Sequence, residues 1–218
     1  MDQLYEVAKI LNSINGLQYI FDSGTILGLH RDSKLIENDL DIDISIFEHN
    51  NSHIDKIINL FKRSGYRYRV IKYGLEPYKL KLKKNGYKRT IDINFFKISP
   101  NGKYYFCPQP ATHNGNRFIK KIRQVFIFII VSIVRKYHLN INYNNYILRL
   151  FYTHYTWLIP TNFFINQSII HNVIKCPRDI EDYLFFRYGD WKVKNKGWNF
   201  IKDDKGLKHI SPDNFFKY

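Results

Sequence analysis

The stretch from Ser23 to Ile46 is SGTILGLHRDSKLIENDLDIDISI, and its last third decides the fold. From residue 40 to residue 47 the chain alternates strictly, with isoleucines on one side and Asp41, Asp43 and Ser45 on the other. A period of two residues is typical of a strand with one buried face. The two carboxylates therefore lie on the same face, about 7 Å apart along the strand. Their charges repel and require neutralisation.

The residues before this strand predict a turn that could bind phosphate. Gln18 to Phe21 is a short apolar run that predicts a strand, and Ser23-Gly24 predicts a tight turn. A helix is expected to begin at Thr25, with its N-terminus facing that turn. Backbone N–H groups in such a turn bind phosphate oxygens. Ser23, Gly24 and Thr25 are therefore candidate phosphate-binding residues.

Two further strands are predicted over residues 78–83 and 88–94, because the Asn-Gly pair between them is a strong hairpin signal. On the second strand, Asp92 occupies a polar position between two isoleucines. Lys79 and Lys81 alternate on the first strand and could contact phosphate. The alternative for both lysines is a solvated strand face.

If the strand that carries Asp92 pairs beside the first one, three carboxylates meet: Asp41, Asp43 and Asp92. Hard oxygen ligands in a cluster favour Mg²⁺ or Mn²⁺. Carboxylates that hold one or two metals can neutralise a phosphate and align an in-line attack on it. The alternative is a polar strand face that is open to water.

The remaining elements complete the predicted fold, which is α+β (α/β-like) with a small mixed sheet flanked by helices. Residues 1–115 are expected to form the catalytic core, and residues 116–218 a mostly helical region that completes the same domain. The other predicted elements are a helix over 2–14 ended by Gly16, a helix over 54–63, a strand over 66–73, a helical region over 117–158, a strand over 169–174 and a helix over 178–187 opened by Pro177.

The net charge of +15 favours an anionic partner. The basic residues are spread along the chain, so nucleic acid is an unlikely partner. Cys107 and Cys176 have no metal-ligand spacing, which argues against structural zinc and is compatible with a reducing cytosol. The N-terminus lacks the pattern of a signal peptide. We expect a cytoplasmic protein that either is free in the cytoplasm or binds peripherally at the inner face of the membrane.

That membrane contact would involve residues 118–137. Their apolar centre, Val125 to Val134, is ten residues long, whereas a spanning helix needs ~20. Basic residues flank the apolar centre on both sides, which suits a helix at an anionic membrane surface. A buried core helix with solvated ends is the alternative.

Four blocks between residues 23 and 191 together resemble the LicD family, which includes the fukutin-related transferases. The first block holds Gly24, Thr25, Leu27, Gly28 and Arg31, and the second holds Asp39, Asp41, Ile42, Asp43 and Ile44. The third is Ile91 to Phe96, and the fourth runs from Cys176-Pro177 to Arg187-Tyr188-Gly189-Asp190-Trp191. The chain departs from the family at Lys34, Asn38 and Leu40, which bears on donor or acceptor preference. Residues 97–168 show no resemblance.

The resemblance implies a nucleotidyltransferase fold and transfer of a phospho-alcohol, such as phosphocholine or ribitol phosphate, from a CDP-linked donor to a sugar hydroxyl, with release of CMP. Such a reaction serves cell-surface polysaccharide synthesis. It also implies that Asp41 and Asp43 bind metal, that Asp92 completes the site or acts as general base, and that Arg31 contacts donor phosphate.

The substrate pocket is less defined by the sequence. Asp39 lies at or before the start of the strand and is expected to assist the site. Tyr188, Asp190 and Trp191 could line the pocket, with Trp191 stacking on a base or enclosing a quaternary ammonium. The alternative is that Trp191 pins its helix to the core.

Two other functions remain open. A nucleotidyltransferase of the same fold would use a nucleoside triphosphate and release pyrophosphate. A non-catalytic module would bind anionic glycans or membranes through its positive charge.

Overall fold

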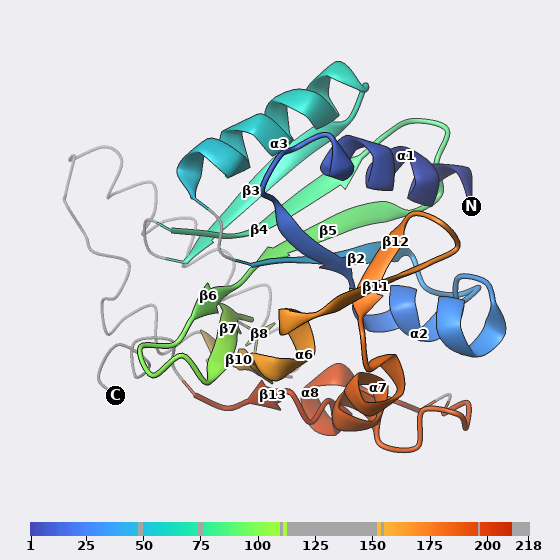
Figure 1. Cartoon of the computed structure of the whole chain (residues 1–218), viewed down its shortest axis with the longest axis vertical. Coiled ribbons are helices and arrows are strands. Elements are labelled where there is room, and N and C mark those ends of the chain that lie inside the picture. Colours follow the sequence, from blue (N-terminus) through green and yellow to red (C-terminus); the bar gives the residue numbers. More distant parts are fainter. Residues whose placement is uncertain are drawn as a thin grey trace, which may run out of the picture.

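A five-stranded mixed sheet forms the centre of the computed structural model (Figure 1). Its strands are β1 (Gln18–Phe21), β2 (Asp41–Phe47), β3 (Arg67–Tyr73), β4 (Glu76–Lys83) and β5 (Thr90–Phe95). Their order is β1-β2-β5-β4-β3. Only the β2–β5 pair is parallel, and the other neighbours in this sheet are antiparallel. The structure describes residues 1–47, 50–73, 76–109, 111–112, 152–153, 155–195 and 197–210.

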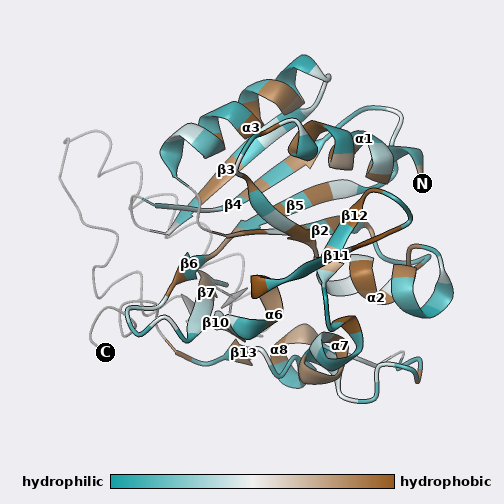
Figure 2. Cartoon of the chain, viewed as in Figure 1, coloured by the Kyte–Doolittle hydropathy of each residue, from teal (hydrophilic) through white to brown (hydrophobic). Residues whose placement is uncertain are grey.

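One face of this sheet is apolar and is covered by α1 (Asp2–Asn12) and α3 (Asn51–Arg63). Leu4 and Val7 of α1 and Ile57 and Phe61 of α3 pack in one buried cluster with the isoleucines of β2 and β5. Figure 2 shows hydrophobic and hydrophilic residues alternating along both helices. The α3 helix begins where the Asn50 side chain accepts a hydrogen bond from the His53 N–H. The strict alternation of β2 thus leaves its polar residues on the opposite face.

The opposite face carries α2 (Ser23–Asp32) and α7 (Ile180–Tyr188). Ser45 lies on this face of β2 and donates a hydrogen bond to Asp22, the residue before α2. Tyr183 of α7 donates to the same carboxylate. Segments at the two ends of the chain therefore meet beside the polar face of the sheet.

A second layer packs below the central sheet in Figure 1. Its four strands are ordered β13 (Leu207–Lys208), β10 (Thr156–Pro160), β7 (Tyr104–Pro108) and β6 (Lys97–Ile98). Aromatic side chains from both halves of the chain form its core, namely Phe47, Phe96, Tyr105, Trp157 and Phe164. The short elements are α6 (Asn162–Ile165), α8 (Phe200–Asp203), β8 (Ala111–Thr112) and β9 (Tyr152–Thr153). The division at residue 115 remains a prediction, although described residues from both ranges share this core.

Three predictions for the C-terminal half are wrong in part. The end of the helical region predicted over 117–158 forms β9 and β10, and its described part pairs with other strands. The strand predicted over 169–174 is instead a hairpin of β11 (Gln167–Ile170) and β12 (Ile174–Pro177). Pro177 ends β12 rather than opening a helix, and α7 begins at Ile180. The described C-terminal residues therefore contain strands as well as helices.

The hairpin has a local cause in its turn. His171 and Asn172 both have positive φ, 46° and 66°. The loop between the paired residues Ile170 and Ile174 has three residues, 171–173. So short a hairpin loop needs left-handed backbone conformations, which asparagine tolerates well. The residues on both sides of this turn are apolar, so nothing in the sequence signals that the chain reverses direction there.

The predicted membrane-surface helix over 118–137 lies outside the described residues. Within the part of the chain that the structure describes, no helix combines the length and apolar content needed to cross a bilayer.

Gly28 allows the loop after α2 to fold back against the helix. A Cβ atom at this position would lie 2.7 Å from the Lys34 carbonyl oxygen and 2.9 Å from the Ile36 nitrogen. Both contacts are with backbone, which cannot swing aside as a flexible side chain can. The close approach places the segment that leads into β2 directly on α2.

We expect Gly28→Ala to lower the free energy of unfolding by about 1–3 kcal/mol, because the added methyl group overpacks this contact. Urea denaturation measures the change. Gly197→Ala is the control, since its Cβ would meet only the Asn195 side chain at 3.5 Å. Equal stability of the Gly28→Ala and Gly197→Ala proteins would contradict the packing account.

Candidate functional site

Three carboxylates converge on the polar face of the central sheet. The parallel register of β2 and β5 sets Asp43 opposite Asp92 and Asp41 opposite Thr90. Asp41, Asp43 and Asp92 each offer one oxygen, and these oxygens lie within 4.8 Å of one another. The expected pairing of the two strands is therefore confirmed, and the three residues could hold a divalent cation.

Asp92 is the most buried member of this triad and has two different oxygens. Its Oδ2 atom lies 3.3 Å from Lys79 Nζ and 2.8 Å from Lys81 Nζ. Its Oδ1 atom is buried and has no hydrogen-bond partner among the described residues. A buried carboxylate oxygen without a partner is costly. The free Oδ1 is the atom that a bound cation would satisfy.

The triad carries more negative charge than its surroundings balance. Burial raises the pKa of Asp43 well above its usual value, and the neighbouring charge of Asp41 raises it further, while Lys79 opposes the shift. A carboxylate in this setting takes up either a proton or a cation. The raised pKa of Asp43 and the convergence of the three carboxylate oxygens therefore both indicate a cation site.

Asp39 lies beside the triad, where its side chain interacts with Asp41. Burial, followed by the hydrogen bond and charge of Asp41, raises the pKa of Asp39 to about 7. Its carboxylate occupies the space where a side chain on Gly24 would be, which explains why position 24 has none. Arg89, which no sequence pattern singled out, donates to the carbonyl oxygens of Asp39 (3.0 Å) and Ile36 (2.9 Å). Arg89 thus holds the loop that carries Asp39.

The Ser23-Gly24-Thr25 turn lies against the same strand. The Thr25 hydroxyl accepts a hydrogen bond of 2.9 Å from the Asp43 N–H, so it ties the turn to the triad. Ser23 has a positive φ of 51°, and its hydroxyl is 3.4 Å from Arg187 Nη2. The Gly24 N–H has no hydrogen-bond partner among the described residues. It is free to bind a phosphate oxygen at the start of α2.

A buried polar network supports this turn from behind. The Asp22 carboxylate accepts hydrogen bonds from the Ser23 N–H, Ser45, Tyr183 and Arg187. Arg187 also donates three hydrogen bonds to Asp204, two from Nε at 2.9 and 3.1 Å and one from Nη2 at 2.6 Å. Asp22, Ser45 and Asp204 were not predicted from the sequence as part of the site. Nothing in their local pattern signals contacts with residues so distant in the chain.

Arg187 is the centre of this network and is only 1% exposed. Burial by itself would lower the pKa of its guanidinium, but the Asp204 carboxylate and then Tyr183 and Asp22 raise it well above the usual value. Arg187 is therefore charged and forms ion pairs with two buried carboxylates, Asp22 and Asp204. Arg187 also donates a hydrogen bond of 2.8 Å from Nη1 to the Tyr183 hydroxyl.

The other predicted site residues are Arg31, Tyr188, Asp190 and Trp191. Among the described residues, none of them forms a hydrogen bond or ion pair with the triad. Arg31 pairs with Asp32 at 3.1 Å and donates to the Trp191 carbonyl oxygen at 3.3 Å. Trp191 is 8% exposed and packs against His30 within the main apolar cluster, as the alternative reading of this residue requires. Their roles in binding phosphate or substrate remain predictions.

Tyr188 and Asp190 flank the C-terminal end of α7. Tyr188 is half-buried and packs against Trp198, with 5.0 Å between the ring centroids. Burial raises the pKa of Tyr188 well above its usual value, and the charge of Asp43 contributes to the shift. Asp190 is exposed. Their part in a substrate pocket also remains a prediction.

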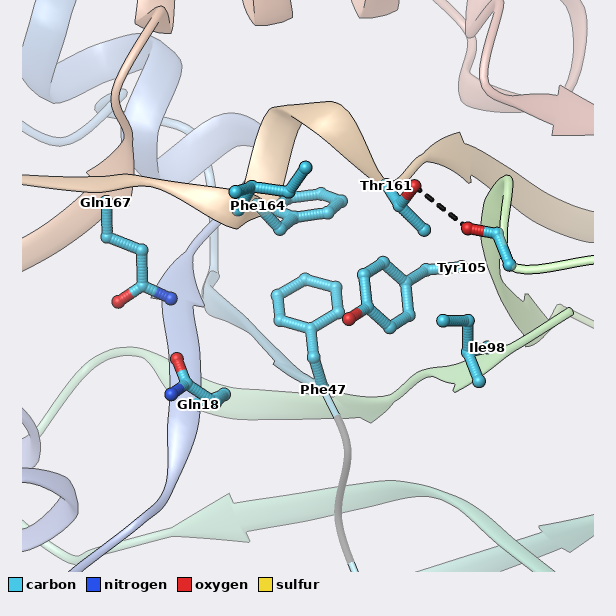
Figure 3. A pocket seen from close by; sticks show the side chains of 9 residues that line it. Gln18, Phe47, Ile98, Tyr105, Thr161, Phe164 and Gln167 are labelled. Carbon is cyan, nitrogen blue, oxygen red and sulfur yellow. Dashed lines mark hydrogen bonds between the residues drawn. The ribbon is translucent and has the colours of Figure 1, made fainter.

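A cavity of about 430 Å³ lies elsewhere, beside Phe47 at the other end of β2 from Asp41 (Figure 3). Its walls combine the aromatic rings of Phe47, Tyr105 and Phe164 with the amides of Gln18 and Gln167. Phe47 is four residues along β2 from Asp43, the nearer aspartate of that strand, which is roughly 13 Å. The cavity is therefore distinct from the acidic site.

Three comparisons relate the chain to known proteins. A family model described as LicD/FKTN/FKRP, nucleotidyltransferase domain, matches residues 16–128, which are 113 of the 218 residues. An uncharacterized protein of Rickettsia typhi is 36% identical over 67 residues, or 29% of this chain and 22% of that protein. The match thus spans about a fifth of that relative's length.

Two structures of the Cid1 poly(U) polymerase share 17% sequence identity over 43% of this chain. The structure with MgGTP bound has a TM-score of 0.34 over 30% of its chain. The complex with the short product ApU has a TM-score of 0.32 over 28% of its chain.

Removal of the guanidinium at position 187 should destabilise the protein strongly. We expect Arg187→Met to lower the free energy of unfolding by ~3–5 kcal/mol, because Asp22 and Asp204 remain buried without their cation. Urea denaturation is the measurement, and Arg63→Met on exposed α3 is the control, with a change within about 0.5 kcal/mol. If the Arg187→Met protein does not fold, adding Asp22→Asn and Asp204→Asn should restore folding. A fully stable Arg187→Met protein would contradict this role.

The raised pKa of Asp39 should make stability depend on pH. Between about pH 4 and pH 7 the folded protein binds a proton at Asp39 that the unfolded chain has released, so stability falls as pH rises through this window. Solvent screens this partly exposed group, so we expect a fall of only ~1–2 kcal/mol relative to Asp39→Asn. Thermal melts from pH 4 to 8 in EDTA, with both proteins, measure it. Parallel pH profiles for the two proteins would contradict the assignment.

Proposed function

Because the chain belongs to the LicD/FKTN/FKRP family, we propose that it is a metal-dependent transferase that moves a phospho-alcohol group from a CDP-linked donor to a glycan hydroxyl. The family supports a transferase, and the phospho-alcohol and its donor are the proposed part. The observation that carries the proposal is the carboxylate triad beside the free Gly24 N–H. These groups together suit a substrate that has a diphosphate.

The donor set of the triad fits a hard divalent cation. Asp41, Asp43 and the free Oδ1 of Asp92 would hold Mg²⁺ or Mn²⁺, as oxygen-only ligands prefer. When bound, this cation neutralises charge on the diphosphate. The buried Oδ1 and the raised pKa of Asp43 both support this occupancy, because each is relieved by a positive charge.

The protein's own groups would then orient the reaction. The Gly24 N–H and the ammonium groups of Lys79 and Lys81 would hold phosphate oxygens of the donor. The acceptor oxygen forms a new bond to the alcohol-bearing phosphorus, and the bond from that phosphorus to the CMP oxygen breaks. CMP departs with the electron pair, and the acceptor proton passes to a nearby carboxylate. The family resemblance suggests Asp92 as general base. Because Oδ1 would hold the cation, the proton would go to Oδ2 after Lys79 and Lys81 have moved from it to the donor phosphate.

The acceptor as a cell-surface glycan, the cytoplasmic location and the peripheral membrane contact through residues 118–137 belong to the same proposal. They rest on the family and on the sequence. The choice of alcohol among choline, ribitol, glycerol and ethanolamine is left to a donor screen.

Asp43→Asn should lower the rate of CMP release by at least ~10³-fold, because the phosphate charge that develops in the reaction loses its cation. The assay incubates the protein with Mg²⁺, a mixture of glycan acceptors that supplies the attacking hydroxyl, and a panel of CDP-choline, CDP-ribitol, CDP-glycerol and CDP-ethanolamine. Asp55→Asn on the exposed side of α3 is the matched control and should keep full activity.

The products separate the proposal from its alternatives. Pyrophosphate from a nucleoside triphosphate, with no CMP from any CDP-alcohol, would indicate a nucleotidyltransferase instead. Full biological activity of an Asp41→Asn, Asp43→Asn protein would indicate a non-catalytic binding module.

A further inference from the structure

Two lysines of β4 contact one oxygen of a triad carboxylate. The Oδ2 atom of Asp92 lies 3.3 Å from Lys79 Nζ and 2.8 Å from Lys81 Nζ, whereas Oδ1 has no hydrogen-bond partner among the described residues. The register of β4 and β5 supports this contact, because it sets Lys81 directly opposite Asp92. Two ammonium groups therefore supply positive charge to the carboxylate that a metal cation would share.

These ammonium groups oppose the binding of a divalent cation. Like charges a few ångströms apart repel, and the repulsion is stronger where burial excludes water. Asp92 is only 3% exposed, so a cation at Oδ1 would share one buried carboxylate with both lysines. The lysines must therefore release Oδ2, at least in part, before the cation can be held tightly.

The two lysines differ in how freely they can move. The side chain of Lys81 is 43% exposed, whereas that of Lys79 is 15% exposed. Arg69 of β3 lies directly opposite Lys81, and like charges at opposed positions of paired strands repel. A lysine also has a flexible four-carbon stem. Lys81 can therefore leave Asp92 without opening the core of the protein.

We infer that Lys81 exchanges its ion pair with Asp92 for one with the donor diphosphate, and that this exchange couples metal binding to donor binding. The inference rests on the proposed function, which places both ligands beside Lys81. No covalent bond changes, because one ammonium group only leaves a carboxylate and pairs with a phosphate oxygen. Lys81 is thus a positioning residue, and Lys79 assists it from the buried side.

The exchange makes the affinity for each ligand depend on the other. While Lys81 is paired with Asp92, the triad holds a cation weakly. Once the donor diphosphate has drawn Lys81 away, Asp92 regains its full negative charge and holds the cation more tightly. The same coupling free energy acts in reverse, so a bound cation also tightens donor binding. The site is therefore completed by the two ligands together.

The decisive variant is Lys81→Gln, whose effects on the two ligands should have opposite signs. We expect the Kd of Mn²⁺ for the donor-free protein, measured by electron paramagnetic resonance, to fall at least ~5-fold because a repelling charge is lost. The donor probe is CDP, which carries the diphosphate common to all CDP-linked donors. We expect its Kd in EDTA, measured by calorimetry, to rise at least ~3-fold because a phosphate loses its ammonium partner.

Two matched variants separate the contact from the overall charge. Lys83 is exposed, lies on the same face of β4 and forms no ion pair among the described residues. Lys83→Gln removes the same charge as Lys81→Gln, and we expect either Kd to change less than about twofold, because salt screens a charge that makes no contact. Lys81→Arg keeps the charge at position 81 and should keep the Kd of Mn²⁺ within about twofold of the wild type.

The coupling itself is the ratio of the CDP Kd in EDTA to the CDP Kd in saturating Mn²⁺. This ratio should fall at least ~5-fold in Lys81→Gln. Weaker Mn²⁺ binding in that variant would overturn the inference, as would equal changes in Lys81→Gln and Lys83→Gln. Weaker binding of both ligands together with a lower melting temperature would also overturn it, because that result indicates a structural role.

The inference and the proposed function fail in different ways, because neither binding measurement requires turnover. Absence of CMP release from every CDP-alcohol contradicts the proposed function, even where Lys81→Gln shifts the two Kd values in opposite directions as the inference requires. Unchanged Mn²⁺ binding or unchanged CDP binding in Lys81→Gln contradicts the exchange, even where CMP is released.

Discussion

The buried pairing of Arg187 with Asp22 and Asp204 is the interaction on which the candidate site depends. Asp22 caps the start of α2 and accepts a hydrogen bond from Ser45, so it fixes the phosphate-binding turn against β2. Its charge is tolerable in the interior only because Arg187 lies 3.3 Å away. Buried ion pairs of this kind contribute little net stability, but removal of one partner is costly. The network is therefore better understood as a device that sets one geometry for the turn.

This dependence changes the meaning of the C-terminal block. The sequence suggested that Tyr188, Asp190 and Trp191 could line a pocket. In the structure Trp191 is buried in the main core, whereas Arg187 and Tyr183 reach the turn through Asp22. The block therefore supports the site by holding Asp22, and with it the turn at the start of α2, in place. Its most informative residue is the arginine inside the helix rather than the tryptophan after it.

Much of the central sheet could be predicted from the sequence, because its signals are local. The alternation from Asp41 to Ser45 and the Asn-Gly hairpin predicted the strands that carry the three aspartates, and the expected pairing of β2 with β5 is confirmed. The network could not be predicted, since Asp22 and Arg187 are 165 residues apart and no periodicity links them. Arg89 was missed for a similar reason, because it contacts backbone carbonyls 50 and 53 residues away. The hairpin at His171 and Asn172 was hidden within an apolar run on both sides.

The distance along the chain between Asp22 and its cation has a consequence for the order of events during synthesis. The strands that carry the triad are complete once residue 95 has been made, and their hairpin contacts are local. Domains fold as the chain emerges from the N-terminal end, and contacts between distant residues form late because closing long loops costs entropy. Asp22 therefore stays without its partner until the segment that contains Arg187 and Asp204 has emerged. The sheet and its carboxylates can form early, but the phosphate-binding turn acquires its final geometry only with the last residues of the described chain.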